Sequence, residues 1–288
     1  MHLSGLQRLI DSIDYIERNL EYEIEIDQVA AVAHMSKFHF QRMFHILTGV
    51  TVAEYVRKRR LTIAAQELIQ SNSKVIDVAL KYGYETPESF SKAFRRVHGL
   101  SPSTVKNKGQ SLKAFPKLSF QIQIKGDVEM DYRIVERKAF RIMGKGIQVT
   151  TRDGENLRRI PEFWQETNTS QFGEELEKAS GPMGVLGVCM EFDSQQDLFT
   201  YFIAVEKNDE APADWEEKVI PASTWAVFEA VGPLPGSIQK VWERIFSEWF
   251  PSTGYEHANA PEMEVYPIEG KVDDDDHRCE VWIPIMKK

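Results

Sequence analysis

Nine side chains on two predicted helices have the chemistry needed to read base pairs. They are polar, basic or aromatic and are predicted to face outward: Lys37, Phe38, Gln41, Arg42 and His45 on the first helix, and Glu88, Ser89, Lys92 and Arg96 on the second. Arginine pairs with guanine and glutamine with adenine through two hydrogen bonds, glutamate accepts from cytosine, and an exposed phenylalanine can touch a thymine methyl group. The pattern favours direct readout of double-stranded DNA.

A second candidate site centres on Glu264, which lies between apolar residues in a predicted strand, Met263 to Tyr266. A carboxylate that faces inward among aromatic rings is costly to bury unless a partner pairs with it. An organic cation, held by the carboxylate and by ring faces, would be such a partner. The candidate binding rings lie in the same half of the chain: Trp164, Tyr201, Trp225, Tyr255, Tyr266 and Trp282. The alternative is an exposed glutamate on an edge strand.

The sequence offers no pattern for a metal ion, a cofactor or a disulfide framework. Its two cysteines, Cys189 and Cys279, lie in separate strand-like runs, and it has no Cys-x-x-Cys or His-x-x-x-His pair. Both cysteines are expected to be core residues of a cytoplasmic protein. The polar first residues and the lack of a long apolar run predict neither a secretion signal nor a membrane segment.

Two other functions stay open beside a ligand-responsive DNA-binding protein. Glu264 with Tyr255 or Tyr266 could serve a small-molecule hydrolase, although no nucleophile and base lie at a specific spacing. The second half could instead recruit a partner for an architectural DNA-binding protein. Turnover of a ligand would favour the first alternative, and failure of any ligand to bind would favour the second. We expect a protein that is not an enzyme.

The charge is distributed unevenly along the chain. The net charge of −9 over 288 residues argues against nucleic acid as a partner. Residues 36–108, however, hold 13 basic against 5 acidic residues, whereas residues 111–288 hold 20 against 32. Positive charge is therefore concentrated where phosphate contacts would be needed.

An internal repeat predicts two helix-turn-helix units in the first part of the chain. Apolar residues recur every three or four positions up to about residue 107. The pair Phe40 and Phe44 recurs as Phe90 and Phe94, and a long helix, Val52 to Ile69, connects the two copies. An inward phenylalanine pair leaves the polar face of each second helix for DNA. The connecting helix spans roughly 27 Å, which approaches the ~34 Å repeat of the major groove.

The second half also repeats. Phe140–Met143 aligns with Trp225–Phe228, and each is followed by a helix that carries tryptophan and then by two strands. Two strand-helix-strand-strand units predict an α+β domain with a pseudo-twofold axis and a central ligand site. The predicted organisation is an all-α double helix-turn-helix domain over residues 1–108, a linker over 109–118 and the α+β domain over 119–288.

Two long segments carry a family resemblance. "SKFHFQRMFHILTGVTVAEYVRKRRLTIAAQEL" followed by "VIDVALKYGYETPESFSKAFRRVHGLSP" resembles the AraC/XylS-type DNA-binding domain over about residues 5–108. The chain departs from the family at Phe38, where tryptophan is frequent, and at Val105–Lys106. The resemblance implies a transcription regulator with double-stranded DNA and RNA polymerase as partners. The N-terminal position of the domain is similar to the Rob-like arrangement.

The second half carries its own resemblance. "VIPASTWAVFEAVGPLPGSIQKVWERIFSEWFPSTGYEHANAPEMEVYP" with the final "EVWIPI" resembles the GyrI-like effector-binding domain of multidrug-sensing regulators over about residues 130–288. This resemblance implies a binding glutamate at Glu264, aromatic residues around it, and a small hydrophobic effector that carries positive charge.

Overall fold

The computed structural model describes the chain from residue 4 to residue 287, apart from residues 106–110, 120–128, 194, 209, 210, 213 and 269. Contacts divide the chain into two compact units. The helical unit contains Ser4–Lys37 and Val50–Gln123, and the sheet unit contains Phe38–Gly49 and Ile124–Lys288. In the described part of the chain, no helix is both long enough and apolar enough to span a bilayer.

The helical unit is built from five α-helices and a short 3₁₀ helix: α1 (Ser4–Arg18), α2 (Ile26–Val32), α4 (Val52–Gln70), α5 (Val75–Lys81), α6 (Pro87–His98) and Pro102–Thr104. The predicted connecting helix and the second helix-turn-helix are confirmed. Thr86 caps α6 because its side chain accepts a hydrogen bond from the Ser89 backbone N–H, and Gly99 ends α6 with a left-handed φ of 80°.

The apolar face of α6 is turned toward α4 and α5. Phe90 and Phe94 are fully buried and pack in one cluster with Leu61 and Leu68 of α4 and with Val78 of α5. Because residues three and four apart share one face of a helix, the polar residues of α6 are left on the opposite face. The predicted inward phenylalanine pair is therefore observed in the second helix-turn-helix.

The predicted linker lies only partly within the described residues. Residues 109 and 110 and most of the predicted strand Ser119–Lys125 lie outside them. Residues 111–118 have no regular secondary structure. Within the helical unit this segment contacts α4: Arg59 Nη1 donates to the Phe115 carbonyl oxygen at 2.5 Å. The domain boundaries stay a prediction.

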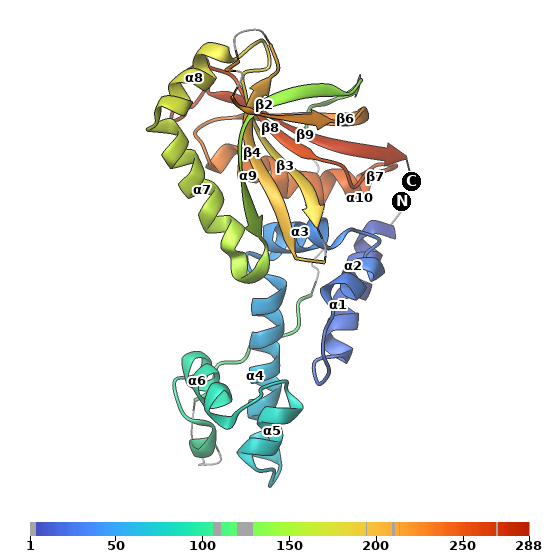
Figure 1. The fold of residues 1–288 in the computed structure, drawn as a ribbon. Coiled ribbons are helices and arrows are strands. Elements are labelled where there is room, and N and C mark those ends of the chain that lie inside the picture. The colour runs from blue at the N-terminus through green and yellow to red at the C-terminus, as the bar shows by residue number, and fades with distance from the viewer. Residues whose placement is uncertain are drawn as a thin grey trace. The chain divides into compact units, whose positions relative to one another are not determined.

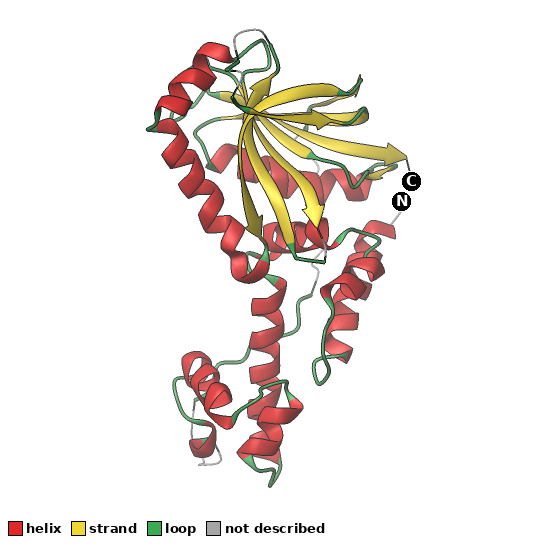
Figure 2. Ribbon diagram, viewed as in Figure 1, coloured by secondary structure: helices red, strands yellow, loops and turns green. Residues whose placement is uncertain are grey.

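Among its described residues, the sheet unit holds nine strands: β1 (Tyr132–Arg137), β2 (Phe140–Thr150), β3 (Val185–Asp193), β4 (Leu198–Glu206), β5 (Glu216–Ile220), β6 (Ser223–Val231), β7 (Tyr255–His257), β8 (Glu262–Tyr266) and β9 (Arg278–Lys287). They form one antiparallel sheet in the order β1-β6-β9-β8-β3-β4-β2-β5, with β7 paired to β9 (Figures 1 and 2).

The helices of this unit include α7 (Glu155–Asn168) and α9 (Gly236–Arg244), one for each predicted repeat. The unit also holds α3 (Lys37–Thr48), α8 (Gln171–Ala179), a π-helical turn (Ile245–Trp249) and α10 (Phe250–Ser252). The order strand, helix, strand, strand occurs twice, as β2-α7-β3-β4 and as β6-α9-β8-β9. The tandem α+β fold is therefore confirmed.

Three strands, β1, β5 and β7, were not part of the predicted strand-helix-strand-strand units. β1 precedes the first repeat but pairs with β6 of the second, and β5 precedes the second repeat but pairs with β2 of the first. The strand order is consequently symmetric about the β8–β3 pair, and each half of the sheet is completed by the other repeat.

The sheet has two differently covered faces. Successive side chains of a strand point to opposite faces. On β4, Tyr201 and Ile203 join a cluster with Phe163 of α7 and Leu176 of α8. Phe202, between them, joins a cluster whose buried members all come from strands. We call these the helix face and the strand face.

Candidate effector-binding and DNA-reading sites

Two carboxylates of β8 lie on the helix face of the sheet. Glu262 and Glu264 alternate with Met263 and Val265, which belong to the strand face. Glu264 accepts hydrogen bonds from Trp242 Nε1 and from Tyr266 Oη, each at 2.7 Å. β8 lies between β9 and β3 and is not an edge strand. Glu264 therefore faces inward among aromatic rings.

Two further predicted residues adjoin Glu264. Trp164 of α7 donates from Nε1 to Tyr201 Oη at 2.7 Å, and its ring meets that of Tyr266 edge-on at 5.1 Å. Gly187, which pairs with Glu264 in the sheet register, leaves room for them, because a Cβ there would lie 2.4 Å from Tyr201 Oη. Burial, followed by the charge of Glu264, raises the pKa of both tyrosines well above the usual value, so both phenols stay neutral.

Three predicted ring residues lie elsewhere. Trp225 and Trp282 contact each other on the strand face, with ring centroids 6.0 Å apart. Their alternation along β6 and β9 directs them away from the face that holds Glu264. Tyr255 of β7 stacks on Trp249 at 5.7 Å. The structure therefore brings together Glu264, Trp164, Tyr201 and Tyr266, but does not bring these three rings to them.

A guanidinium group already lies against this cluster. Arg42 of α3 places its Cζ 4.0 Å from the centroid of the Trp242 ring. Its Nη1 lies 2.7 Å from Glu262 Oε2 and its Nη2 lies 3.9 Å from Glu264 Oε1. Arg42 Nη1 also donates to Cys189 Sγ at 3.3 Å. Two carboxylates and a ring face thus surround one cation.

Arg42 contacts Glu262, Glu264 and Trp242, and the rings of Tyr266, Trp164 and Tyr201 adjoin Glu264. We call these six residues the cation cluster. Glu262 and Trp242 were not predicted from the sequence as site residues. Glu262 lies two positions before Glu264, and the same period-two argument could have placed both on one face. Trp242 lies on the helix of the second repeat, as Trp164 does in the first.

Arg42 and Glu262 are both charged at neutral pH. Burial would raise the pKa of the Glu262 carboxyl, but the charge of Arg42 and the neighbouring His257 and His39 lower it to about 2. Burial would likewise lower the pKa of Arg42, but Glu262, Cys189 and Glu264 raise it above its usual value. The contact is therefore an ion pair in which one partner, Glu262, is only 1% exposed.

Three neighbours of Arg42 on α3 also contact the rest of the sheet unit, to which α3 itself belongs. Phe38 packs on the rings of Phe192 and Phe199, with centroids 4.4 Å away in both cases. Gln41 Oε1 accepts a hydrogen bond from Thr151 Oγ1 at 2.7 Å. Phe38, predicted to face outward toward DNA, is buried here.

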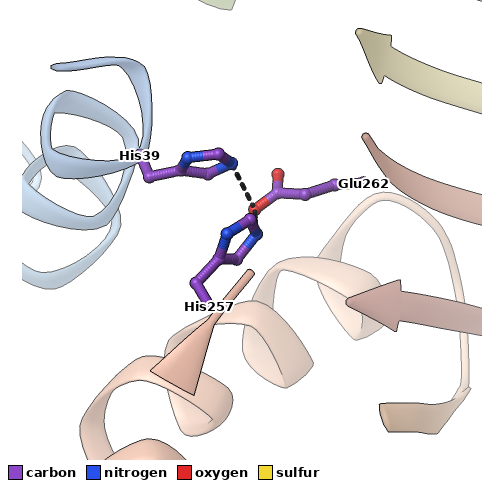
Figure 3. A group of neighbouring side chains, drawn as sticks. All are labelled: His39, His257 and Glu262. Carbon is purple, nitrogen blue, oxygen red and sulfur yellow. Dashed lines mark ion pairs between the residues drawn. The ribbon is translucent and has the colours of Figure 1, made fainter. Parts of the chain in front are cut away.

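His39, the third neighbour, joins His257 and Glu262 in a buried group (Figure 3). His39 Nε2 and His257 Nε2 lie 3.6 Å and 3.0 Å from Glu262 Oε1. The three residue types could bind a metal ion, but His257 Nδ1 accepts a hydrogen bond from the Asn259 backbone N–H. In a neutral ring the hydrogen is then on Nε2, the atom a metal would need, so we interpret the group as part of the α3 contact.

The remaining predicted DNA-reading residues differ between the two helices. On α3, Lys37 and His45 are partly buried. On α6 all four predicted residues are exposed: Glu88, Ser89, Lys92 and Arg96. The two equivalent helices thus differ, because α6 presents its polar face to solvent whereas α3 directs much of its own to the sheet unit.

Comparison with known families and proteins gives two matching family models. One, described as a GyrI-like small molecule binding domain, matches residues 130–286, which is more than half of the chain. The other, described as a helix-turn-helix domain, matches residues 29–108.

Individual relatives match one part of the chain each. The transcriptional activator AarP of Providencia stuartii is 42% identical over 89 residues, which cover 31% of this chain and 66% of AarP. The regulatory protein SoxS of Salmonella typhimurium is 36% identical over 103 residues, which cover 35% of this chain and 96% of SoxS. A solved structure of SAV2435 bound to tetraphenylphosphonium is 22% identical, with a TM-score of 0.48, and covers 55% of this chain and 94% of that one.

Proposed function

As a member of the GyrI-like small molecule binding domain family with an AraC-type helix-turn-helix domain, the chain is a DNA-binding regulator, and we propose that it senses an organic cation at Glu264. The observation that carries this proposal is the Arg42 guanidinium, which lies between the Trp242 ring and two carboxylates. A carboxylate that pairs with a cation beside an aromatic face is the chemistry by which quaternary and other organic cations are recognised.

The predicted roles of the individual residues belong to the same proposal. Glu264 supplies the charge, and Trp164, Tyr201 and Tyr266 supply ring contacts, with Glu262 and Trp242 added. The exposed residues of α6 read one half of the DNA site, and the equivalent residues of α3 read the other. RNA polymerase as a partner and a cytoplasmic location follow from the same role, and we propose that the effector is bound without being turned over.

The experiment measures tetraphenylphosphonium binding to the full chain by quenching of tryptophan fluorescence. Glu264→Gln is expected to weaken binding by about 1–3 kcal/mol, the scale of a charge-assisted contact in a partly buried site. The affinity for the neutral ligand triphenylphosphine oxide should fall much less, because ring stacking does not depend on charge.

The matched control is Asp274→Asn, which removes one negative charge on an exposed loop. A general effect of the net charge on cations is long-ranged and screened by salt, so it would make both variants equal. Equal losses at moderate salt would therefore contradict a cation site at Glu264.

A further inference from the structure

Helix α3, whose Arg42 contacts the cation cluster, is one of the two predicted DNA-reading helices. Arg42, predicted to pair with a base, is paired with Glu262 and Glu264. Gln41, predicted to do the same, is hydrogen-bonded to Thr151. Phe38 lies between Phe192 and Phe199. Each of these side chains has satisfied, within the sheet unit, the interaction that it would make with DNA.

The partners of these side chains on the sheet unit have the same hydrogen-bonding and apolar character as the edge of a base pair. Carboxylate oxygens accept from a guanidinium as guanine O6 and N7 do. The Thr151 hydroxyl donates to Gln41 Oε1, as the adenine amino group would. The two phenylalanine rings take the place of an apolar contact for Phe38. One helix face cannot hold both sets of partners at once.

From this overlap we propose that docking of α3 on the sheet unit is an autoinhibitory contact, and that a cationic effector displaces Arg42 and frees the helix to read DNA. The inference rests on the proposed function, because it assigns the guanidinium and the effector to one site. The polar face of α6 stays exposed while α3 is docked, so one reading helix remains available to DNA. Docking of α3 therefore weakens specific DNA binding but does not abolish it. An effector that binds only the undocked state shifts the population toward it.

The test uses a contact of α3 that lies outside the cation cluster. Phe192→Ala removes the ring that touches Phe38 at 4.4 Å and His39 at 5.3 Å. The affinity of the full chain for a duplex selected from a random-sequence library is measured at fixed salt with no cation present. Loss of the contact is expected to raise this affinity about tenfold, since apparent affinity scales with the population of the competent state.

Phe140→Ala is the matched control, because Phe140 is a partly buried phenylalanine that packs on the strand face. Its affinity for the duplex should stay within about twofold of the parent chain. The same affinity in both variants, or a loss in Phe192→Ala alone, would overturn the proposal. Since no cation is added, a failure of tetraphenylphosphonium to bind would count against the proposed function and leave this test intact.

A second variant covers the case in which Phe192→Ala does not fold. Thr151→Val keeps the volume of the side chain and removes the hydroxyl that donates to Gln41. One hydrogen bond corresponds to about a threefold to tenfold change in the docking equilibrium. A gain of about that size in DNA affinity is expected, and no gain would overturn the proposal.

Discussion

Glu262→Gln is expected to raise the affinity of the full chain for the selected duplex by at least about tenfold, with no effector present. The substitution keeps the size of the side chain and removes the charge 2.7 Å from Arg42 Nη1. Breaking a buried ion pair by neutralising one partner costs about 3–5 kcal/mol, and Arg42 would keep only the more distant Glu264 carboxylate, at 3.9 Å. This cost falls on the docked state of α3, so the population that can read DNA grows.

The control for this change is Glu229→Gln. Glu229 forms an exposed ion pair with Arg278 in the same sheet unit, and its replacement alters the net charge by the same amount. A gain in both variants would assign the effect to the overall field of the protein. A folded Glu262→Gln chain with unchanged DNA affinity would contradict the account of docking.

Alkylation of the two cysteines gives an independent readout of the same variant. Burial raises the pKa of the Cys189 and Cys279 thiols to about 12, so both should react slowly in the parent chain. Cys189 is in contact with Arg42, whereas Cys279 Sγ donates to the Ala230 carbonyl oxygen of the neighbouring strand β6. Release of α3 by Glu262→Gln should speed alkylation of Cys189 severalfold and leave Cys279 unchanged.

Arg42→Ala is expected to strengthen cation binding and to relax the DNA sequence preference. It leaves Glu262 and Glu264 without their internal cation, at about the same 3–5 kcal/mol cost to the docked state. Affinity for tetraphenylphosphonium should therefore rise at least about tenfold. On DNA the gain from undocking is offset by loss of the proposed Arg42 base contact, worth about 1–3 kcal/mol, and the preference relaxes at one base pair.

Arg96→Ala separates these two effects. Arg96 is exposed on α6, at a position predicted to face DNA. Its removal should weaken DNA binding and leave the affinity for the cation unchanged. If Arg42→Ala also leaves the cation affinity unchanged, the guanidinium does not compete with the effector.

The sequence predicts the elements of this fold better than their partners. Phe90 and Phe94 specify the inward face of α6 through helical spacing alone, and Glu264 could be assigned to an aromatic environment from its neighbours on the strand. Both features depend on local periodicity, which the order of residues contains. The exchange of β1 and β5 between the repeats could not be predicted in this way, because an edge strand can pair with either half.

The ring residues show a second limit. Trp225 and Trp282 have the residue type and the strand context of binding residues, yet they lie on the strand face. Assigning a face requires the register of β6 and β9 against the rest of the sheet, and a shift by one residue would reverse the assignment. The tryptophan content of the domain therefore predicted more ring contacts at Glu264 than the structure provides.

The contact between α3 and the cation cluster has no local signal. Arg42 and Glu262 are 220 positions apart, and the properties that suit arginine and glutamine to bases suit them equally to carboxylates and hydroxyls. Residue type alone could not distinguish a side chain that is available to bind DNA from one that is already paired within the protein.

Because DNA and the cation each require α3 to leave the cation cluster, the binding of the two ligands should be thermodynamically coupled. The affinity of the parent chain for the selected duplex is measured with and without saturating tetraphenylphosphonium, and its affinity for the cation with and without the duplex. We predict that each ligand strengthens the other by one common factor of about tenfold, as linkage requires, and that Arg42→Ala reduces the factor to about one. Strong binding of both ligands with no coupling in the parent chain would contradict the account.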